Sequence, residues 1–155
     1  MTKIEWSQGT WTREPASIVE EGDAIKVESI EGSDWWRITS YGFIHNDGHA
    51  LTVDFPNESA MEVTFILDYT EQFDQCGIFI KADDENWVKA GIEFCDGYPQ
   101  VGAVVTRTTS DWSSTRISEW MGKEVTVRAS RSGDVVTIRA GINGELQLVR
   151  VAPLD

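Results

Sequence analysis

Glu93 is the residue best placed to do chemistry, because the residues around it predict a row of polar side chains across three strands. The Asp-Gly pair at 96–97 is a two-residue hairpin signal, and pairing the flanking segments across it sets Glu93 opposite Gln100. A second turn at 83–86 sets Gln75 on the other side of Glu93. A carboxylate between two amides can bind a polar ligand or can form a structural hydrogen-bonded cluster. The sequence leaves both interpretations open.

The register of these strands follows from the positions of their apolar residues. The predicted strands are 76–82, 87–94 and 99–107, consecutive and antiparallel. With Lys81 opposite Trp87, the apolar residues of all three strands fall on one face. We therefore expect Val88, Ala90 and Ile92 to be buried against a second sheet.

The opposite face carries glycine at the same level in each strand. Gly77, Gly91 and Gly102 should lie side by side, and glycine inside a strand often marks a close approach by another group. One interpretation is an open trough for a ligand, which would accept valine at position 91 without loss of stability. The other is a trough filled by the chain itself. The predicted ligand-binding residues of this face are Gln75, Phe79, Trp87, Lys89, Gly91, Glu93 and Gln100.

Aromatic and charged side chains on this face favour a sugar or another small polar ligand. Trp87 and Lys89 share the face with Glu93, and a polar ring stacks on indole while its hydroxyls bond to charges. Packing of the lysine stem on the indole is the simpler alternative. We expect two polar-aromatic loops to rim the groove, and they add Trp36, Tyr41, Asp111 and Trp112 to the candidate ligand-binding residues.

Catalysis by Glu93 would make the protein a hydrolase of the glycosidase type. Such enzymes use two carboxyl groups, about 5–5.5 Å apart for retention or roughly 6.5–9.5 Å for inversion. The partner of Glu93 would have to be Asp34 or Asp111, because Asp74 and Asp96 are expected to face away or lie in turns.

The sequence predicts neither a metal site nor a cofactor. His45 and His49 flank a turn, but no third ligand is well placed beside them. The acidic run at 83–86 lacks the alternating oxygen ligands and the glycine of a calcium loop. No phosphate loop, dinucleotide fingerprint or Ser-His-Asp pattern is present.

The charge of the chain limits its partners. The 155 residues include 26 acids and 13 Lys plus Arg, for a net charge of −13. A nucleic-acid binder needs a basic surface, and so does a protein bound to an anionic membrane. We therefore expect neither partner. Cys76 and Cys95 fall on opposite faces and should not form a disulfide, and no apolar leader is visible, so a cytoplasmic protein is expected.

Short alternating segments separated by Gly-containing turns predict an all-β fold. These segments recur at 8–12-residue spacing without a helical pattern, apart from at most one helical turn within 114–121. Such a chain forms a two-sheet sandwich or jelly roll, here a single domain over 1–155. We expect 33–44 to pair with a returning strand at 51–55, and Val127 to lie opposite Ile138 in the C-terminal meander.

Four stretches of the chain resemble a known family. They are DWWRITSYGFIHNDGHAL (34–51), FDQCGIFI (73–80), WVKAGIEF (87–94) and VVTRTTSDWS (104–113). They closely resemble a widespread family of unknown function typified by the fungal regulator of enolase. The resemblance implies a concanavalin-A-like jelly-roll sandwich of two antiparallel sheets, the fold of many lectins and glucanases. Cys76 stands where the family is expected to have alanine.

The resemblance leaves the activity open, since fold does not dictate function. The strand with Glu93 lacks the two or three spaced carboxylates of glucanases, and the galectin sugar motif is absent. We therefore predict a non-catalytic domain that binds a carbohydrate or another small polar ligand. The alternatives are a regulatory protein that docks on a metabolic enzyme, as the resemblance implies, and the hydrolase that uses Glu93.

Overall fold

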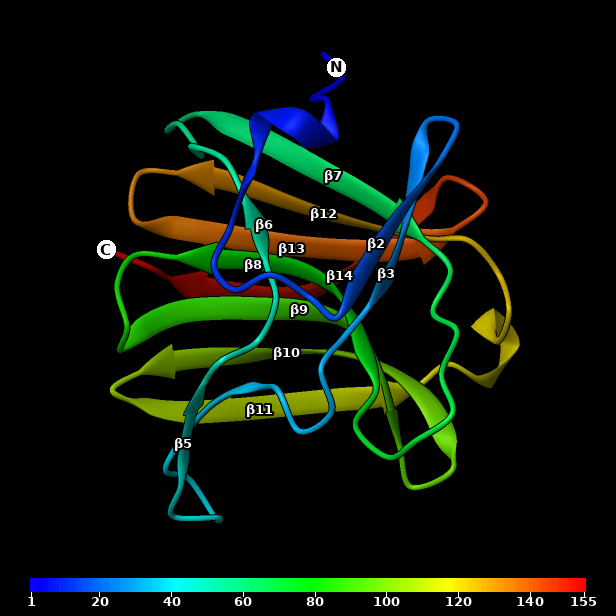
Figure 1. Cartoon of the computed structure of the whole chain (residues 1–155). Helices are drawn as coiled ribbons and strands as arrows, with labels where there is room; N and C mark the ends of the chain where they lie inside the picture. The colour runs from blue at the N-terminus through cyan, green and yellow to red at the C-terminus, as the bar shows by residue number, and fades with distance from the viewer. The chain divides into compact units, whose positions relative to one another are not determined.

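The computed structural model describes all residues from 1 to 155, and they form two compact units. The first unit is Met1–Asp54 and the second is Phe55–Asp155. Apart from two single turns of 3₁₀ helix, η1 (Trp6–Gln8) and η2 (Ser118–Trp120), the regular structure is β-strand (Figure 1). Neither turn provides the long apolar helix that crosses a bilayer. The predicted all-β class and the single helical turn within 114–121 are confirmed.

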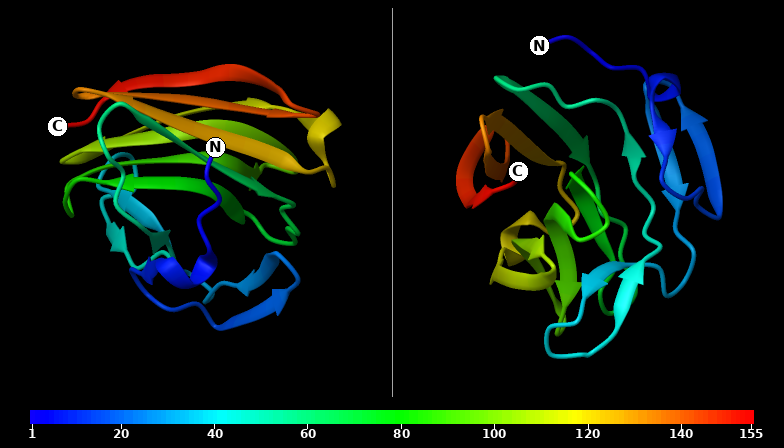
Figure 2. Two further views of the ribbon diagram at one scale, coloured as in Figure 1. Left: turned by 90° about the horizontal axis from the view of Figure 1, so that it is seen from above. Right: turned by 90° about the vertical axis from the view of Figure 1, so that its left-hand side faces the viewer.

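The second unit is a sandwich of two four-stranded antiparallel sheets. The strands of the first sheet, in spatial order, are β11 (Thr109–Arg116), β10 (Tyr98–Arg107), β9 (Asn86–Cys95) and β8 (Gln75–Lys81). Those of the second sheet are β14 (Glu145–Pro153), β13 (Val135–Ile142), β12 (Val125–Ser132) and β7 (Ser59–Phe65). In the left panel of Figure 2 the orange and red strands of the second sheet lie above the green and yellow-green strands of the first.

The predicted register of β8, β9 and β10 is confirmed at every pair. Cys95 lies opposite Tyr98, and Lys81 lies opposite Trp87. Asp96 and Gly97 both have positive φ, as a two-residue hairpin of this type requires. The Asp-Gly turn and the apolar alternation therefore fix the same register.

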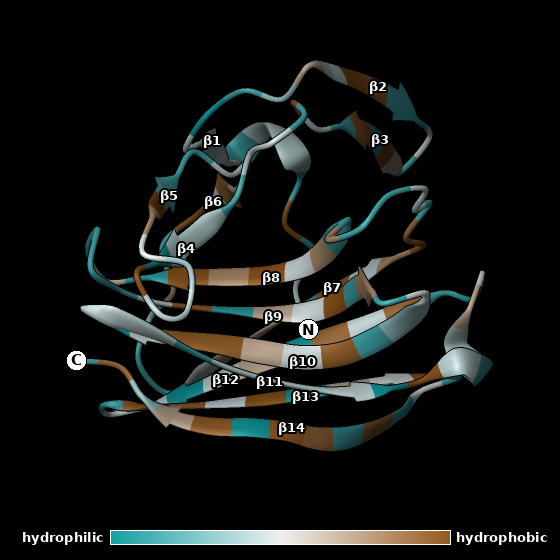
Figure 3. Ribbon diagram, turned by 90° about the horizontal axis from the view of Figure 1, so that it is seen from below, coloured by the Kyte–Doolittle hydropathy of each residue, from teal (hydrophilic) through white to brown (hydrophobic).

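The apolar faces of the two sheets meet in one core. Val88, Ala90 and Ile92 of β9 are buried there, as predicted, against Val127 and Ile138 of the second sheet. Strand β14, at the edge of the second sheet, carries both hydrophobic and hydrophilic residues along its length (Figure 3). Burial of these branched side chains, worth about 25 cal/mol per Å² of apolar surface, holds the sandwich together.

The glycine row is explained by contact between backbones. A Cβ atom on Gly91 would lie 2.1 Å from the carbonyl oxygen of Cys76 and 2.6 Å from the Cα of Gly77. A Cβ on Gly77 would meet the carbonyl oxygen of Ala90 at 2.0 Å, and one on Gly102 would meet that of Ser113 at 2.2 Å. Only glycine permits this approach. The open-trough interpretation, under which valine would be tolerated at position 91, is wrong, since the space beside Gly91 is occupied by the adjacent strand.

The C-terminal meander has a register different from the predicted one. Val127 lies opposite Ala140, two residues beyond the predicted Ile138, because the turn is Gly133-Asp134 instead of Ser132-Gly133. A bulge between Ile138 and Arg139 shifts the pairing of β13 with β14 by one residue, so that Ile138 lies opposite Arg150. A shift of two residues keeps each side chain on its face, so the apolar pattern did not exclude it.

The first unit consists of three two-stranded ribbons. They pair β1 (Thr10–Trp11) with β6 (Leu51–Thr52), β2 (Ser17–Glu21) with β3 (Ala24–Glu28), and β4 (Trp35–Arg37) with β5 (Ile44–Asn46). The predicted pairing of 33–44 with a strand at 51–55 is wrong, since 33–44 turns back on itself and residues 51–52 pair with β1. The division into two units leaves the single domain over 1–155 a prediction.

Replacement of Gly91 by alanine tests the backbone contact. We expect Gly91→Ala to lower the free energy of unfolding by about 1–3 kcal/mol, because even one methyl group forces β8 and β9 apart. Urea unfolding at neutral pH measures the effect. Thr115→Val, at an exposed position of edge strand β11, is the control and should change the stability by less than about 0.5 kcal/mol. An unchanged stability of Gly91→Ala would contradict the account of the glycine row.

Candidate functional site

The outer face of the first sheet carries the predicted site residues in cross-strand rows. One row is Gln75, Glu93, Gln100 and Arg116, and the glycine row ends at Ser114. The next row is Phe79, Lys89, Val104 and Trp112, and the last is Lys81, Trp87, Thr106 and Ser110. Sequence reasoning thus placed Gln75, Phe79, Trp87, Lys89, Gly91, Glu93 and Gln100 correctly on one face.

The amides beside Glu93 bond to backbone carbonyls and, in the case of Gln100, also to the Ser114 hydroxyl. The Gln100 side-chain nitrogen donates to the Cys95 carbonyl at 2.9 Å, and its oxygen accepts from the Ser114 hydroxyl at 2.7 Å. The Gln75 nitrogen donates to the Phe73 carbonyl at 3.1 Å. These bonds hold the row in one conformation, and no second carboxylate belongs to the row.

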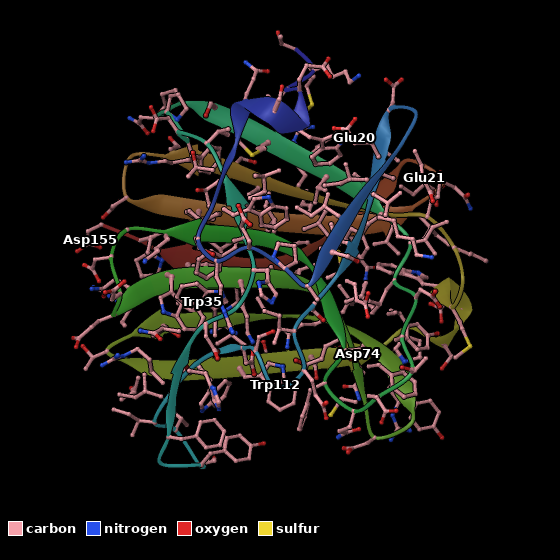
Figure 4. All side chains as sticks on the ribbon, in the orientation of Figure 1. Glu20, Glu21, Trp35, Asp74, Trp112 and Asp155 are labelled. Atoms are coloured by element: carbon pink, nitrogen blue, oxygen red, sulfur yellow. The ribbon has the colours of Figure 1, made fainter.

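The aromatic residues of this face differ in exposure. Trp87 is fully buried, with its ring 5.7 Å from that of Phe79. A ligand cannot stack on this indole in the observed conformation. Trp112 of β11 (Figure 4) is 37% exposed, and its pairing with Val104 places it in the same row as Lys89. The exposed aromatic surface of the face therefore comes from Trp112 and from Tyr98, which is 39% exposed and lies opposite Cys95 on the same face.

Asp111 does not share a face with Glu93. Residues 108–113 were expected in a loop, but 109–113 belong to β11, in which Asp111 pairs with Val105 on the core side. Arg150 of β14 donates to the Asp111 carboxylate and to the Ser113 hydroxyl, both at 2.7 Å. Asp111 thus links the edges of the two sheets, and the prediction that it rims the groove is wrong. It also cannot be the second carboxyl of a hydrolase that uses Glu93.

Trp36 and Tyr41 belong to the β4–β5 hairpin of the first unit. Trp36 is buried, and its indole nitrogen donates to the Thr39 carbonyl at 2.9 Å. Tyr41 packs edge-on against Trp36 and stacks on Phe43, which meets His45 edge-on. The two predicted residues therefore lie together in a row of aromatic rings.

The histidines have structural bonds within the first unit. The Ile30 amide donates to His49 Nε2 at 3.1 Å, so the proton of the ring is on Nδ1, which lies 3.0 Å from the Arg13 carbonyl. His45 Nδ1 lies 3.6 Å from Asp47. The structure shows no group of three or more His, Cys, Asp or Glu residues that could hold a metal ion.

Sequence reasoning placed Tyr41 in a polar-aromatic loop but did not single out the exposed apolar residues beside it. Ile38, Phe43 and Ile44 are 40–50% exposed there, and Tyr41 is 51% exposed. The signal was present, because an apolar run without a charge in an acidic chain is unusual for a surface segment. Isoleucine and aromatic residues favour strands, and this preference explains the prediction of a strand over 33–44.

Neither thiol is activated for chemistry. Cys76 and Cys95 are free, as predicted. Burial raises the pKa of Cys76 to about 11, and burial together with the carboxylates of Asp96 and Glu93 raises the pKa of Cys95. Both groups are therefore neutral thiols at pH 7, whereas a nucleophilic cysteine has a lowered pKa.

Alkaline pH should destabilise the fold through Cys76. The unfolded chain ionises this thiol near pH 9 and the folded chain near pH 11, so the stability it contributes is complete below pH 9 and is lost as the pH rises to 11. At pH 10 the loss is about 1.4 kcal/mol relative to pH 8. Urea unfolding of wild type and Cys76→Ala at both pH values should show a smaller decrease for the variant. Equal decreases would contradict the assignment.

Comparison with known proteins places the chain among relatives of unknown activity. Residues 11–155 match the family described as "Protein of unknown function (DUF1349)". The chain is 35% identical over 150 residues to "Regulation of enolase protein 1" of Saccharomyces cerevisiae, covering 96% of this chain and 75% of that protein.

A solved structure has the same fold. It is described as the crystal structure of a functionally unknown protein from Saccharomyces cerevisiae, and it matches with a TM-score of 0.91 at 34% identity. The match covers 98% of this chain and 82% of that one. Family match, sequence identity and structural similarity agree over nearly the whole length, and the chain belongs to the DUF1349 family of proteins of unknown function.

Proposed function

We propose that this chain is a non-catalytic protein that regulates enolase by binding to it directly. The observation that carries the proposal is the 35% identity over 96% of the chain to a protein named as a regulator of enolase. We carry the role that this name gives to the yeast protein over to the present chain, with enolase as its partner. Contact with the enzyme is the physical means by which a small domain can change another protein's activity without chemistry of its own.

The candidate face supports binding over catalysis. The row of Gln75, Glu93, Gln100 and Arg116 contains one carboxylate, and Asp111 bonds to Arg150 on the other side of the sheet. Hydrolysis of a glycosidic bond requires both an acid and a base or nucleophile. The hydrolase interpretation therefore has the least support of the three functions considered.

A carbohydrate or another small polar ligand is the second candidate. Exposed Trp112, in one row with Lys89, is the observation that favours it, because an indole beside a cation suits a polar ring. The glycine row gives this candidate no support, since backbone contact accounts for it. A glycan array tests it, and loss of any signal in Trp112→Ala would identify the face.

Titration calorimetry with purified enolase from the same organism tests the first proposal. We expect saturable binding with a Kd of about 1 μM, which corresponds to about −8 kcal/mol, and a change in enolase turnover at saturation. A second acidic metabolic enzyme of similar size serves as the control and should show no heat of binding. Absence of binding to enolase at concentrations of about 100 μM would refute the proposal.

A further inference from the structure

We infer that the loop at residues 38–44, which joins β4 to β5, is the anchor by which this chain docks into an apolar pocket of enolase. The inference rests on the proposed function and adds to it the contact surface. The loop is the cyan tip that continues from β5 in Figure 1.

The loop presents apolar side chains to solvent without any charge. Its sequence is Ile-Thr-Ser-Tyr-Gly-Phe-Ile, and all seven positions are exposed. All 26 acidic residues of the chain lie outside residues 35–46. A cluster of exposed apolar residues on a soluble surface marks an interaction site more often than chance exposure does.

The backbone of the loop is held in one conformation. Ile38 and Ser40 have φ of 69° and 61°, and a β-branched residue such as Ile38 rarely adopts this region. Ile38 donates to the Phe43 carbonyl at 2.8 Å, and Gly42 donates back to the Ile38 carbonyl at 2.6 Å. Strained residues that the surrounding bonds maintain cluster at binding sites. The loop thus presents its side chains with little conformational entropy left to lose on binding.

The aromatic rings give the loop a rigid apolar core. Tyr41 lies between buried Trp36, 5.6 Å away, and Phe43, 5.3 Å away. Tyrosine and tryptophan dominate the binding energy of protein interfaces, where they fill pockets at the centre of the contact. Buried centres of interfaces are also depleted in charge. The loop carries no charge, although the chain has a net charge of −13. It can therefore enter an apolar pocket on a protein without the free-energy cost of removing water from a charged group.

Charge introduced at Ser40 tests this inference without removing a contact. Asp and Asn both tolerate positive φ, so Ser40→Asp and Ser40→Asn should fold alike. We expect Ser40→Asp to weaken binding to enolase by about tenfold or more, since a carboxylate would be buried, and Ser40→Asn to change it less than about threefold. Calorimetry measures both, and thermal unfolding confirms equal stability.

Removal of an aromatic ring provides the second test. Tyr41→Ala should weaken binding by about tenfold or more. Tyr98→Ala is the matched control, because Tyr98 is also exposed but belongs to β10 and stacks under Arg116, 4.0 Å from the ring centre. This variant should bind as wild type does.

The outcomes separate the inference from the proposed function. Wild-type binding to enolase that survives both Ser40→Asp and Tyr41→Ala overturns the loop assignment and leaves the proposed function standing. Absence of wild-type binding refutes both. Binding of a glycan array or of phosphatidylcholine vesicles that is lost in Tyr41→Ala would assign the loop to a sugar or a lipid surface and overturn the inference as stated.

Discussion

Contact between the backbones of β8 and β9 is the constraint on which the first sheet depends. The carbonyl of Cys76 occupies the place that a side chain at Gly91 would take, and the carbonyl of Ala90 does the same at Gly77. The glycines thus fix where the strands meet, and the apolar alternation then directs Val88 and Ile92 into the core. The polar row of Glu93 and the aromatic row of Trp112 follow from the same register.

This backbone contact, and not a ligand groove, explains the glycine row on the outer face of the first sheet. A glycine row seen in sequence can reflect an open groove or close strands, and here the strands are close. Trp87 is buried, and Asp111 serves the edge between the sheets through its bond to Arg150. Most of the face is therefore explained by the needs of the fold. Exposed aliphatic and aromatic residues gather without a charge in the β4–β5 loop, and this loop is the surface that we propose for the contact with enolase.

The sequence predicted the central strands well because two independent signals agreed there. The Asp-Gly turn and the alternation of apolar residues admit one register. In the C-terminal meander and in the β4–β5 loop, these two signals did not determine the strand pairing. Gly133 has a turn-forming residue on each side, so the C-terminal meander could shift by two residues with its faces intact. Strand β11 follows a turn at Thr108, and the β4–β5 loop turns at Ile38, both with positive φ. Non-glycine residues seldom adopt that conformation, so the residue at which each turn occurs could not be predicted from the sequence.

Hydroxyl-radical footprinting with and without saturating enolase tests the central claim most directly, because it reports the solvent exposure of individual aromatic side chains. The structure exposes one set of aromatic residues on the loop, Tyr41 and Phe43, and a different one, Trp112, on the sheet face. The account predicts that enolase lowers the oxidation of Tyr41 and Phe43 and leaves that of Trp112 unchanged. Protection of Trp112 with unchanged Tyr41 and Phe43 would show that the sheet face is the binding surface and would contradict the account.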